Sequence, residues 1–332
     1  MITGFTCGKF LPFHKGHEAL IRFGLEHCDE LTVLVCASDQ ELISGETRAA
    51  WIRNTCSQDP GLIVKVLPYK ESQLPNTSES SRRVSKIWAS EFRRWVPNAN
   101  IFFSSEPYGA YVADFMNIQH LSFDLSRTTV PVSATQIREN PGAFWEYLPV
   151  AVRPNYCKKV VILGTESTGK STLTKQLANH YKVPFVAEAG RDLISNSREF
   201  ALEELYLVAR AHAGAIAKAV KQGYPLIIVD TDIHITQSYA RLFFDKQLEI
   251  EEAVYTTNKA DIYLYLTADV PLVQDGTRLG EAARQSLDAS HRRVLSEYSI
   301  KPIEIAGEWE GRKRKAIETI DRLFLPSGQK IT

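Results

Sequence analysis

The stretch KVVILGTESTGKSTLTKQLANHY, residues 159–181, decides the fold of the second half of the chain. Its centre matches the pattern G-x-x-x-x-G-K-[ST] in full, with an apolar, strand-like run before it and a helical pattern after it. Glycines let the backbone turn tightly so that several N–H groups point at phosphate oxygens, and the helix N-terminus adds its positive dipole end. The stretch therefore predicts a phosphate-binding loop (P-loop), in which Lys170 reaches the β- and γ-phosphates of ATP and Ser171 binds Mg²⁺. The residues expected to hold the nucleotide are Gly164, Glu166, Ser167, Thr168, Gly169, Ser171 and Thr172.

Acidic residues downstream fit phosphoryl transfer to a small acceptor. The run LIIVDTD ends a buried-strand pattern in Asp230 and Asp232, where a carboxylate usually serves Mg²⁺ or its waters. The segment PFVAEAGRDL places Glu188 and Arg191 just past another strand, where an acceptor would lie. An ATPase motor would need a water-orienting residue that we do not identify in the sequence. These residues favour a small-molecule kinase.

Two further arginines, Arg278 and Arg284, lie in DGTRLGEAARQ. This Gly-containing segment is suited to a mobile lid, and arginines there would offset charge on the transferring phosphoryl group. Each arginine alone could equally be an exposed helix charge.

A second, different anion site is indicated near the start of the chain. In GKFLPFHKGHEAL, residues 8–20, His14 and His17 flank a glycine between a strand and a helix, where the helix N-terminus favours an anion. A metal site is disfavoured because no third Cys, His or acid is placed to complete it. Downstream, VPVSATQIREN, residues 130–140, puts Ser133, Thr135 and Arg138 at a predicted strand-to-helix junction able to grip a triphosphate.

Apolar runs alternate with helical segments almost throughout, which is the rhythm of parallel sheets covered on both faces. The rhythm breaks at EYLPVAVRPNYCKK, so we predict two doubly wound α/β domains, residues 1–153 and 157–332. A length of 332 residues also favours two domains.

Composition restricts partners and compartment. Acidic and basic residues number 39 each, which argues against nucleic acid as a main partner. Five scattered cysteines and the lack of a signal peptide or a span-length apolar run predict a cytoplasmic protein outside the membrane. The sequence leaves the oligomeric state open, a homo-oligomer included.

The order of the segments adds a resemblance. HxGH together with [IV]-S-x-T-x-x-R resembles the nucleotidyltransferase superfamily, and SSEPYG, RTTVPVSATQIRENPGAFWEYLP, VRPNYCKKVVILGTESTGKSTL, DTD and DGTRLG follow in the order of the NadR-type bifunctional enzymes. Those enzymes join a nicotinamide mononucleotide adenylyltransferase to a ribosylnicotinamide kinase. The resemblance covers nearly the whole chain. It implies a Rossmann-like nucleotidyltransferase followed by a P-loop kinase.

The resemblance also implies residue roles in the first domain. Nicotinamide mononucleotide would attack the α-phosphorus of ATP through its own phosphate, giving NAD⁺ and pyrophosphate, so a base is not needed. His14 and His17 would stabilise the triphosphate, and Trp88 would stack on the cationic ring unless it only packs its helix. The residues expected to assist are Gly8, Lys9, Phe10, Ser133, Thr135 and Arg138.

In the second domain the resemblance implies phosphorylation of the 5′-hydroxyl of nicotinamide riboside with ATP and Mg²⁺. A hydroxyl needs a proton acceptor, for which Glu188 is the first candidate and Asp232 its rival, with Asp230 nearer the metal. Arg191 would hold the acceptor.

Some features depart from the family. The first motif begins at residue 8, so we expect no helix-turn-helix repressor domain and do not extend DNA binding to this chain. Ala134 removes a hydroxyl from the serine-rich form of the second motif. Arg210 and His212 stand where a glutamine-bearing pattern was expected, which puts the riboside pocket in doubt. Two alternatives stay open: an adenylyltransferase for another phosphorylated molecule fused to a nucleoside kinase, and an ATP-sensing regulator with one inactive half.

Overall fold

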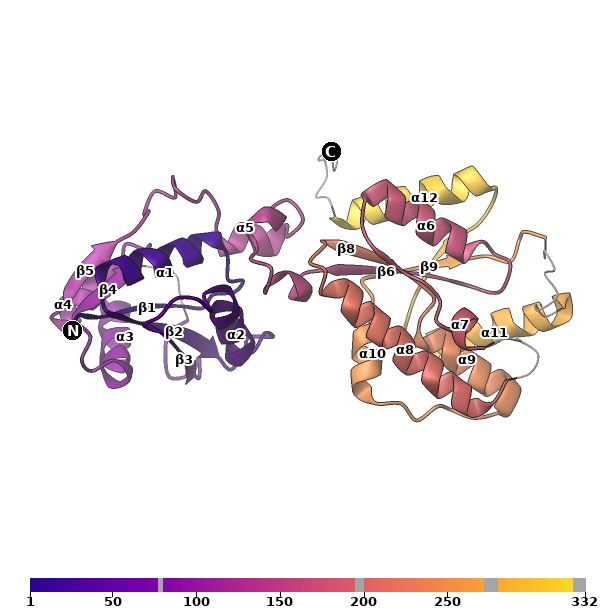
Figure 1. The fold of residues 1–332 in the computed structure, drawn as a ribbon, viewed down its shortest axis with the longest axis horizontal. Coiled ribbons are helices and arrows are strands. Elements are labelled where there is room, and N and C mark those ends of the chain that lie inside the picture. Colours follow the sequence, from indigo (N-terminus) through magenta and orange to yellow (C-terminus); the bar gives the residue numbers. More distant parts are fainter. Residues whose placement is uncertain (77–79, 195–199, 272–279, 325–332) are drawn as a thin grey trace. The chain divides into compact units, whose positions relative to one another are not determined.

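The computed structural model describes residues 1–76, 80–194, 200–271 and 280–324. The chain divides into two compact units, Met1–Arg153 (unit 1) and Pro154–Thr332 (unit 2), each with its own five-stranded sheet (Figure 1). All pairings between the described strands are parallel, which confirms the predicted fold class.

Unit 1 is built on a sheet of strand order β3-β2-β1-β4-β5. Its elements are β1 (Thr3–Gly8), α1 (Lys15–His27), β2 (Glu30–Ser38), α2 (Gly45–Thr55), β3 (Leu62–Tyr69), α3 (Arg82–Trp95), β4 (Ile101–Ser104), α4 (Gly109–Met116), β5 (Gln119–Ser122), α5 (Ala134–Glu139) and the 3₁₀ turn η1 (Trp145–Tyr147). This order matches the first five strands of the Rossmann order 3-2-1-4-5-6, with the first strand in the centre.

Unit 2 has the order β10-β9-β6-β8-β7, again with its first strand in the centre. Following the boundary turn η2 (Arg153–Asn155), its elements are β6 (Lys158–Gly164), α6 (Lys170–Tyr181), β7 (Phe185–Val186), α7 (Gly190–Leu193), α8 (Leu202–Val220), β8 (Leu226–Asp230), α9 (Ile233–Phe244), α10 (Glu252–Asn258), β9 (Ile262–Leu266), α11 (Glu281–Glu297), β10 (Ile303–Ile305) and α12 (Trp309–Phe324).

The central strand of unit 2 shows why the sheet is covered on both faces. Val160 and Ile162 join one core cluster with α6 and α12, whereas Val161 and Leu163 join another with α8, α9 and α11. Successive side chains of a strand point to opposite faces, so a continuous apolar run is the signature of a strand buried on both sides. In Figure 1, α6 and α12 lie on one side of this sheet and α8 to α11 on the other.

Some elements were not anticipated from the sequence. Helix α4 and the short strands β5 and β10 were not predicted, since two of them are only three or four residues long. The strand predicted before Ser133 is wrong, because residues 123–133 form a loop. In that loop the Asp124 carboxylate accepts hydrogen bonds from the backbone N–H groups of Thr128, Thr129 and Val130, which would otherwise be available to a sheet.

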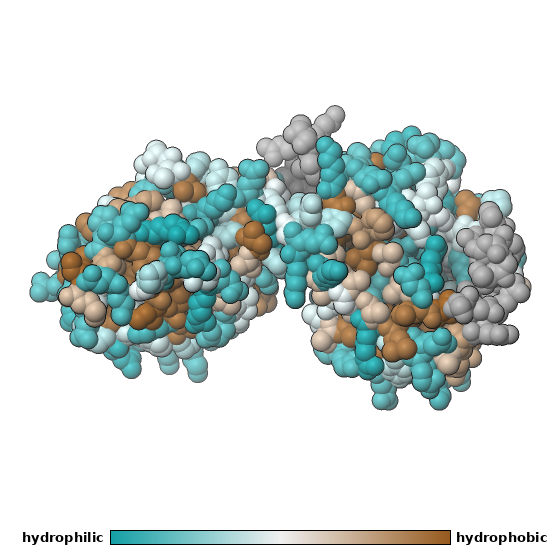
Figure 2. Space-filling model, viewed as in Figure 1, coloured by the Kyte–Doolittle hydropathy of each residue, from teal (hydrophilic) through white to brown (hydrophobic). Residues whose placement is uncertain are grey.

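The surface drawn in Figure 2 is mostly hydrophilic, with hydrophobic residues in scattered patches on both units. Among the exposed large hydrophobic side chains are Leu42, Val150 and Leu207. Within the described ranges, helices long and apolar enough to cross a bilayer do not occur.

Candidate functional sites

The first candidate site begins where the central strand of unit 1 ends. Strand β1 stops at Gly8 and helix α1 starts at Lys15, so residues 9–14 form a loop at the carboxyl end of the sheet, where ligands bind in open α/β folds. His14 is the N-cap of α1, and its Nδ1 accepts a hydrogen bond from the backbone N–H of Gly16 at 3.1 Å. Nδ1 is therefore the unprotonated nitrogen, and Nε2–H is left as a donor.

The rings of His14 and His17 stack, with 3.8 Å between centroids and 29° between planes. Burial, followed by the charge of Arg127, lowers the pKa of His14 to about 4. Burial also lowers the pKa of His17, together with His14 and Arg127. The buried Nδ1 of His17 has no hydrogen-bond partner within the described structure. Both rings are therefore neutral near pH 7 when an anion is absent.

Arg138 connects the second motif to this loop. One of its terminal nitrogens donates to the backbone oxygen of Leu11 at 2.6 Å and the other to Thr135 Oγ1 at 3.0 Å. Ser133 caps α5 in a capping box with Gln136, so the Ser133 hydroxyl already accepts the Gln136 backbone N–H. The two motifs, more than a hundred residues apart in sequence, are thus held together by a guanidinium.

A cavity of about 910 Å³ in unit 1 is lined by every residue that the sequence predicted for this site. These residues are Gly8, Lys9, Phe10, His14, His17, Trp88, Ser133, Thr135 and Arg138. Phe10 lies beneath the site rather than open to it, because its ring is buried and meets His17 edge-on at 5.0 Å. Trp88 both lines the cavity and packs, with its Nε1 donating to the Pro75 oxygen at 3.1 Å.

Arg127 also lines this cavity and was missed by sequence reasoning. It comes from the loop before α5, forms an ion pair with Glu106 at 3.1 Å, and is close enough to both histidines to lower their pKa values. The signal available was a basic residue in a polar segment directly upstream of the second motif.

The second candidate site follows the central strand of unit 2. Strand β6 ends at Gly164 and helix α6 begins at Lys170, which gives the predicted strand–loop–helix order. Gly164 has φ +137°, and a Cβ there would lie 2.6 Å from the Leu266 oxygen, so glycine is required. Lys170 is buried and its Nζ donates to the Thr165 oxygen at 2.9 Å, within the loop. The Thr168 hydroxyl bonds the same oxygen, whereas Thr172 is exposed on α6.

Ser171 and Asp230 come together as the sequence predicted for a metal site. The Ser171 hydroxyl donates to Asp230 Oδ2 at 2.5 Å, while Asp230 Oδ1 is buried and has no hydrogen-bond partner among the residues that the structure describes. Burial raises the pKa of Asp230, although the charge of Lys170 opposes the shift. A hydroxyl beside a carboxylate with an unsatisfied oxygen is a hard oxygen donor set, which fits Mg²⁺ completed by phosphates and water.

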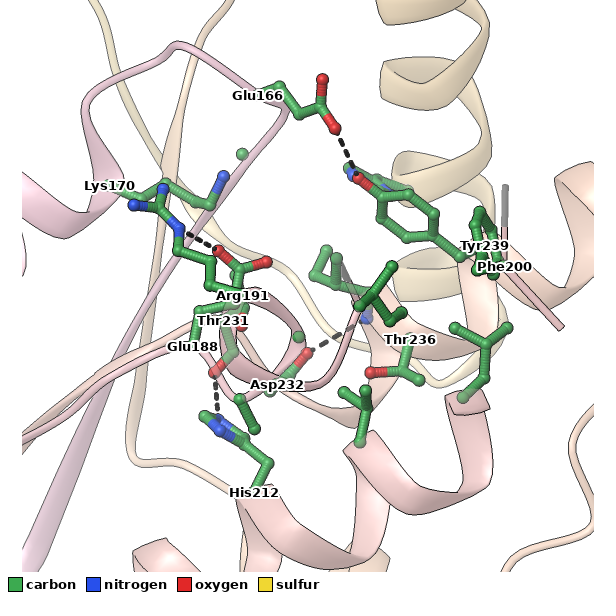
Figure 3. Close-up of a pocket in the computed structure, with 18 of the residues that line it drawn as sticks. Glu166, Lys170, Glu188, Arg191, Phe200, His212, Thr231, Asp232, Thr236 and Tyr239 are labelled. Carbon is green, nitrogen blue, oxygen red and sulfur yellow. Dashed lines mark hydrogen bonds and ion pairs between the residues drawn. The ribbon is translucent and has the colours of Figure 1, made fainter. Parts of the chain in front are cut away.

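A cavity of about 350 Å³ opens beside this loop (Figure 3). Glu188 and Arg191 line it and form an ion pair, with Arg191 Nε 3.1 Å from Glu188 Oε2. Tyr239 and Phe200 lie on the opposite side of the view from Glu188. Sequence reasoning missed these two aromatic residues, since nothing in their own segments separates them from ordinary core side chains.

Asp232 lines the same cavity but its oxygens are occupied. Oδ1 accepts the backbone N–H groups of His234 and Ile235, which caps helix α9, and Oδ2 lies 2.6 Å from His234 Nδ1. Its side chain has no exposed surface. Asp232 thus caps α9, and of the two candidate bases Glu188 is the one with an exposed side chain, at 25%.

The sequence also singled out Arg278, Arg284, Arg210 and His212 in unit 2. Arg278 lies outside the described residues. Arg284 was expected in a lid segment, but it lies in the first turn of α11, 2% exposed, and donates to the Val270 oxygen at 2.9 Å. It does not contribute to the lining of the cavity. Of the two residues that depart from the family, Arg210 pairs with Glu251 on the surface, and His212 lines the cavity with its Nε2 3.2 Å from the Thr231 oxygen.

Fold and sites together define a chain of two nucleotide-binding α/β units, each with a phosphate loop after its central strand. Residues 159–312 match the AAA domain family. The chain is similar to the trifunctional NAD biosynthesis/regulator protein NadR of Salmonella typhimurium, at 26% identity over 98% of this chain and 84% of that protein. NadR of Escherichia coli is 27% identical over 97% and 83%. The fold is that of a NadR crystal structure in complex with NAD and AMP-PNP, with a TM-score of 0.78, 22% identity and coverage of 100% of this chain and 98% of that one.

Proposed function

We propose that this chain is a bifunctional NAD salvage enzyme. Unit 2 phosphorylates nicotinamide riboside with ATP to nicotinamide mononucleotide, and unit 1 joins that mononucleotide to the adenylyl group of a second ATP, giving NAD⁺ and pyrophosphate. The observation that carries the proposal is the pair of cavities, each lined by a phosphate loop from its own unit. The similarity to NadR proteins along nearly the whole chain supports the choice of substrates.

In unit 1 the reaction needs positioning and charge neutralisation more than proton removal. The phosphate of nicotinamide mononucleotide is already an anion and attacks the α-phosphorus in line, with pyrophosphate leaving. His14 donates from Nε2–H to the triphosphate. The ring of His17 stacks on the ring of His14. Arg127 and Arg138 add positive charge to the same cavity, and Lys9, Ser133 and Thr135 assist. Trp88 offers an aromatic face to the cationic nicotinamide ring, an attraction of roughly 0.5–2 kcal/mol.

In unit 2 the attacking group is a hydroxyl, so a proton must leave. Glu188 accepts that proton, because it faces the cavity and its bond from Arg191 orients the carboxylate. Lys170 turns from the Thr165 oxygen to the β- and γ-phosphates when ATP binds. Ser171 and Asp230 hold Mg²⁺, which supplies positive charge at the phosphate oxygens when bound. Arg278, which lies outside the described residues, is proposed to offset further charge, whereas buried Arg284 is not.

Location and assembly belong to the same proposal. All five cysteines are free thiols, which supports a reducing, cytoplasmic setting. A homo-oligomer is compatible with both sites, because each cavity is completed by its own unit.

The test is a product assay with nicotinamide riboside, ATP and Mg²⁺, with products identified by mass. Accumulation of NAD⁺ is expected. Nicotinamide mononucleotide alone would indicate a live kinase beside an inactive or misassigned unit 1. ATP hydrolysis without any phosphorylated nucleoside would contradict the proposal and favour an ATP-sensing switch.

A further inference from the structure

His291 is a buried residue of the kinase cavity without a role in the proposed mechanism. It lies on α11, its side chain is 1% exposed, and it lines the cavity with Lys170 and Tyr239. Its ring centroid is 5.9 Å from that of Tyr239, and neither Asp230 nor Ser171 is among the residues that line this cavity. A polar side chain in this position can bond to whatever fills the cavity.

A short hydrogen-bond relay fixes which nitrogen of His291 carries the proton. The Ser290 hydroxyl donates to the Ser238 backbone oxygen at 3.1 Å. The Ser238 hydroxyl donates to the Ser290 hydroxyl oxygen at 2.9 Å. Both hydroxyl protons are thereby in use. His291 Nδ1 lies 2.7 Å from the Ser238 hydroxyl oxygen, and with both hydroxyl protons placed in this way Nδ1 is assigned as the donor.

The other nitrogen, Nε2, is consequently a lone pair. It makes no hydrogen bond with any residue that the structure describes, while the ring lines the cavity. Burial, followed by the charge of Lys170, lowers the pKa of His291 to about 3, so the ring stays neutral at physiological pH. A neutral acceptor cannot bond a deprotonated phosphate oxygen and does not repel a cationic nucleoside. It can accept only from a hydroxyl or an N–H group.

We propose that His291 Nε2 accepts a hydrogen bond from an uncharged donor of the nucleoside, either a ribose hydroxyl or the carboxamide N–H, and so helps to select the acceptor. This inference rests on the proposed kinase function of unit 2. In this role His291 leaves the proton on the nucleoside, so its part differs from that of Glu188, the proposed proton acceptor.

Two substitutions at this residue separate its two nitrogens. In His291→Asn the side-chain amide reaches the position of Nδ1 and keeps the bond to Ser238, but the acceptor at Nε2 is lost. In His291→Gln the amide reaches the position of Nε2 and restores an acceptor there. We expect His291→Asn to raise KM for nicotinamide riboside about threefold to tenfold, as for one lost hydrogen bond, with KM for ATP unchanged. His291→Gln should recover most of the loss, and the exposed His180→Asn on α6 should behave as wild type.

Substrate analogues identify the donor. Three analogues each lack one donor: the 2′-deoxyriboside, the 3′-deoxyriboside and nicotinic acid riboside, which carries a carboxylate in place of the carboxamide. Wild-type enzyme should bind the analogue that lacks the donor to Nε2 more weakly than nicotinamide riboside. His291→Asn should lose its discrimination against that analogue, and its treatment of the other two should match that of the wild type. Equal loss on all three analogues would show that His291 only supports the fold, and would overturn the inference.

A spectroscopic measurement on wild-type enzyme does not depend on how the variants fold. Imidazole ¹⁵N shifts should show His291 protonated on Nδ1 and unprotonated on Nε2, with Nε2 shifting when nicotinamide riboside is added. Ser290→Ala frees the Ser238 proton for Nδ1 and should move the ring proton to Nε2. A wild-type ring already protonated on Nε2, or unchanged at saturating riboside, would contradict the inference. Failure of wild-type enzyme to phosphorylate or bind the riboside would instead contradict the proposed function.

Discussion

Arg48 donates a 2.6 Å hydrogen bond from its guanidinium to the backbone oxygen of Lys9, and so ties helix α2 to the phosphate loop of unit 1. Arg48 has no exposed side-chain surface. Its other bonds go to the Cys36 and Ser44 oxygens and, at 2.6 Å, to the Glu41 carboxylate. The loop of residues 9–14, which ends at His14 directly before the helix that carries His17, is therefore held by a buried ion pair.

Replacing Arg48 by methionine should destabilise unit 1 and stop adenylyl transfer. The change leaves the buried Glu41 carboxylate with only the longer ion pair to Lys9, at 3.5 Å, and breaking a buried pair costs about 3–5 kcal/mol. Kinase activity of unit 2 should remain. Thermal unfolding together with separate assays of the two activities measures both effects. The control is Arg53→Met on the same helix, whose half-exposed pair with Glu46 should contribute less than about 1 kcal/mol. Similar stability of the two variants would show that the buried pair does not support unit 1.

Lys170→Ala should separate the two activities. The lysine belongs to the loop of unit 2 alone, so phosphorylation of the riboside should fall by about a hundredfold or more, whereas adenylylation of supplied nicotinamide mononucleotide stays nearly intact. Product formation from each substrate is measured separately. Lys175→Ala, on the exposed side of the same helix, serves as the control. Loss of both activities in Lys170→Ala would contradict independent sites.

Glu188→Gln and Asp232→Ala should fail in different ways. Glu188 is accessible in the cavity, so its amide should lower kcat of the kinase by about 10²–10⁴ without changing the unfolding temperature. Asp232 caps α9 and pairs with His234, so its loss should lower stability by about 1–2 kcal/mol. Circular dichroism melts and steady-state kinetics distinguish the two. A fully stable Asp232→Ala variant with abolished turnover would make Asp232 the base.

Asp230 and Asp232 show which part of the site could not be predicted from the sequence. The pattern LIIVDTD predicted a strand ending in functional carboxylates, and the P-loop, both parallel sheets and the clustering around His14 follow from similar local patterns. Asp230 and Asp232 carry the same signal in sequence. Their difference depends on where α9 begins and on the position of His234, since these decide whether the oxygens are already bonded. Such occupancy is set by tertiary neighbours.

Arg284 illustrates the same limit from the opposite direction. A glycine-containing segment suggested a lid, yet the arginine lies buried in the first turn of α11 because the backbone oxygen of Val270 is there to accept its hydrogen bond. Charge and local flexibility were readable from the sequence, whereas the buried acceptor was not. Arg127 and His291 were missed for a related reason, since their importance comes from the histidines and serines that surround them in space.

ATP binding to unit 1 should be coupled to proton uptake. Without a ligand, burial lowers the pKa of His14 to about 4, so the ring is unprotonated at pH 6–8. A triphosphate beside it favours the protonated form and raises that pKa, and the added proton on Nδ1 then displaces the hydrogen bond from the Gly16 N–H. The complex then holds more protons than the free protein, and affinity for ATP should increase as pH falls from 8 to 6, by at most about tenfold per pH unit for one proton.

Calorimetric titration in buffers of different ionisation enthalpy measures this uptake, with Lys170→Ala as the background so that unit 2 binds less ATP. His14→Asn should lose the coupling, and the exposed His27→Asn should keep it. Zero proton uptake at pH 6.5 would mean that both rings remain neutral and act only as donors.

Trp88 and Trp95 lie on the same helix and offer a matched pair for the nicotinamide subsite. Both pack against the same core cluster, but only Trp88 of the two lines the unit 1 cavity, while the indole of Trp95 bonds Glu91. Trp88→Leu should raise KM for nicotinamide mononucleotide by about 2- to 30-fold, the value of a cation–π contact, and leave KM for ATP within about twofold. Trp95→Leu should lower stability and leave both constants unchanged. If the two variants lose stability alike and neither changes KM for the mononucleotide, Trp88 serves packing, and the cationic ring must bind another surface of the cavity.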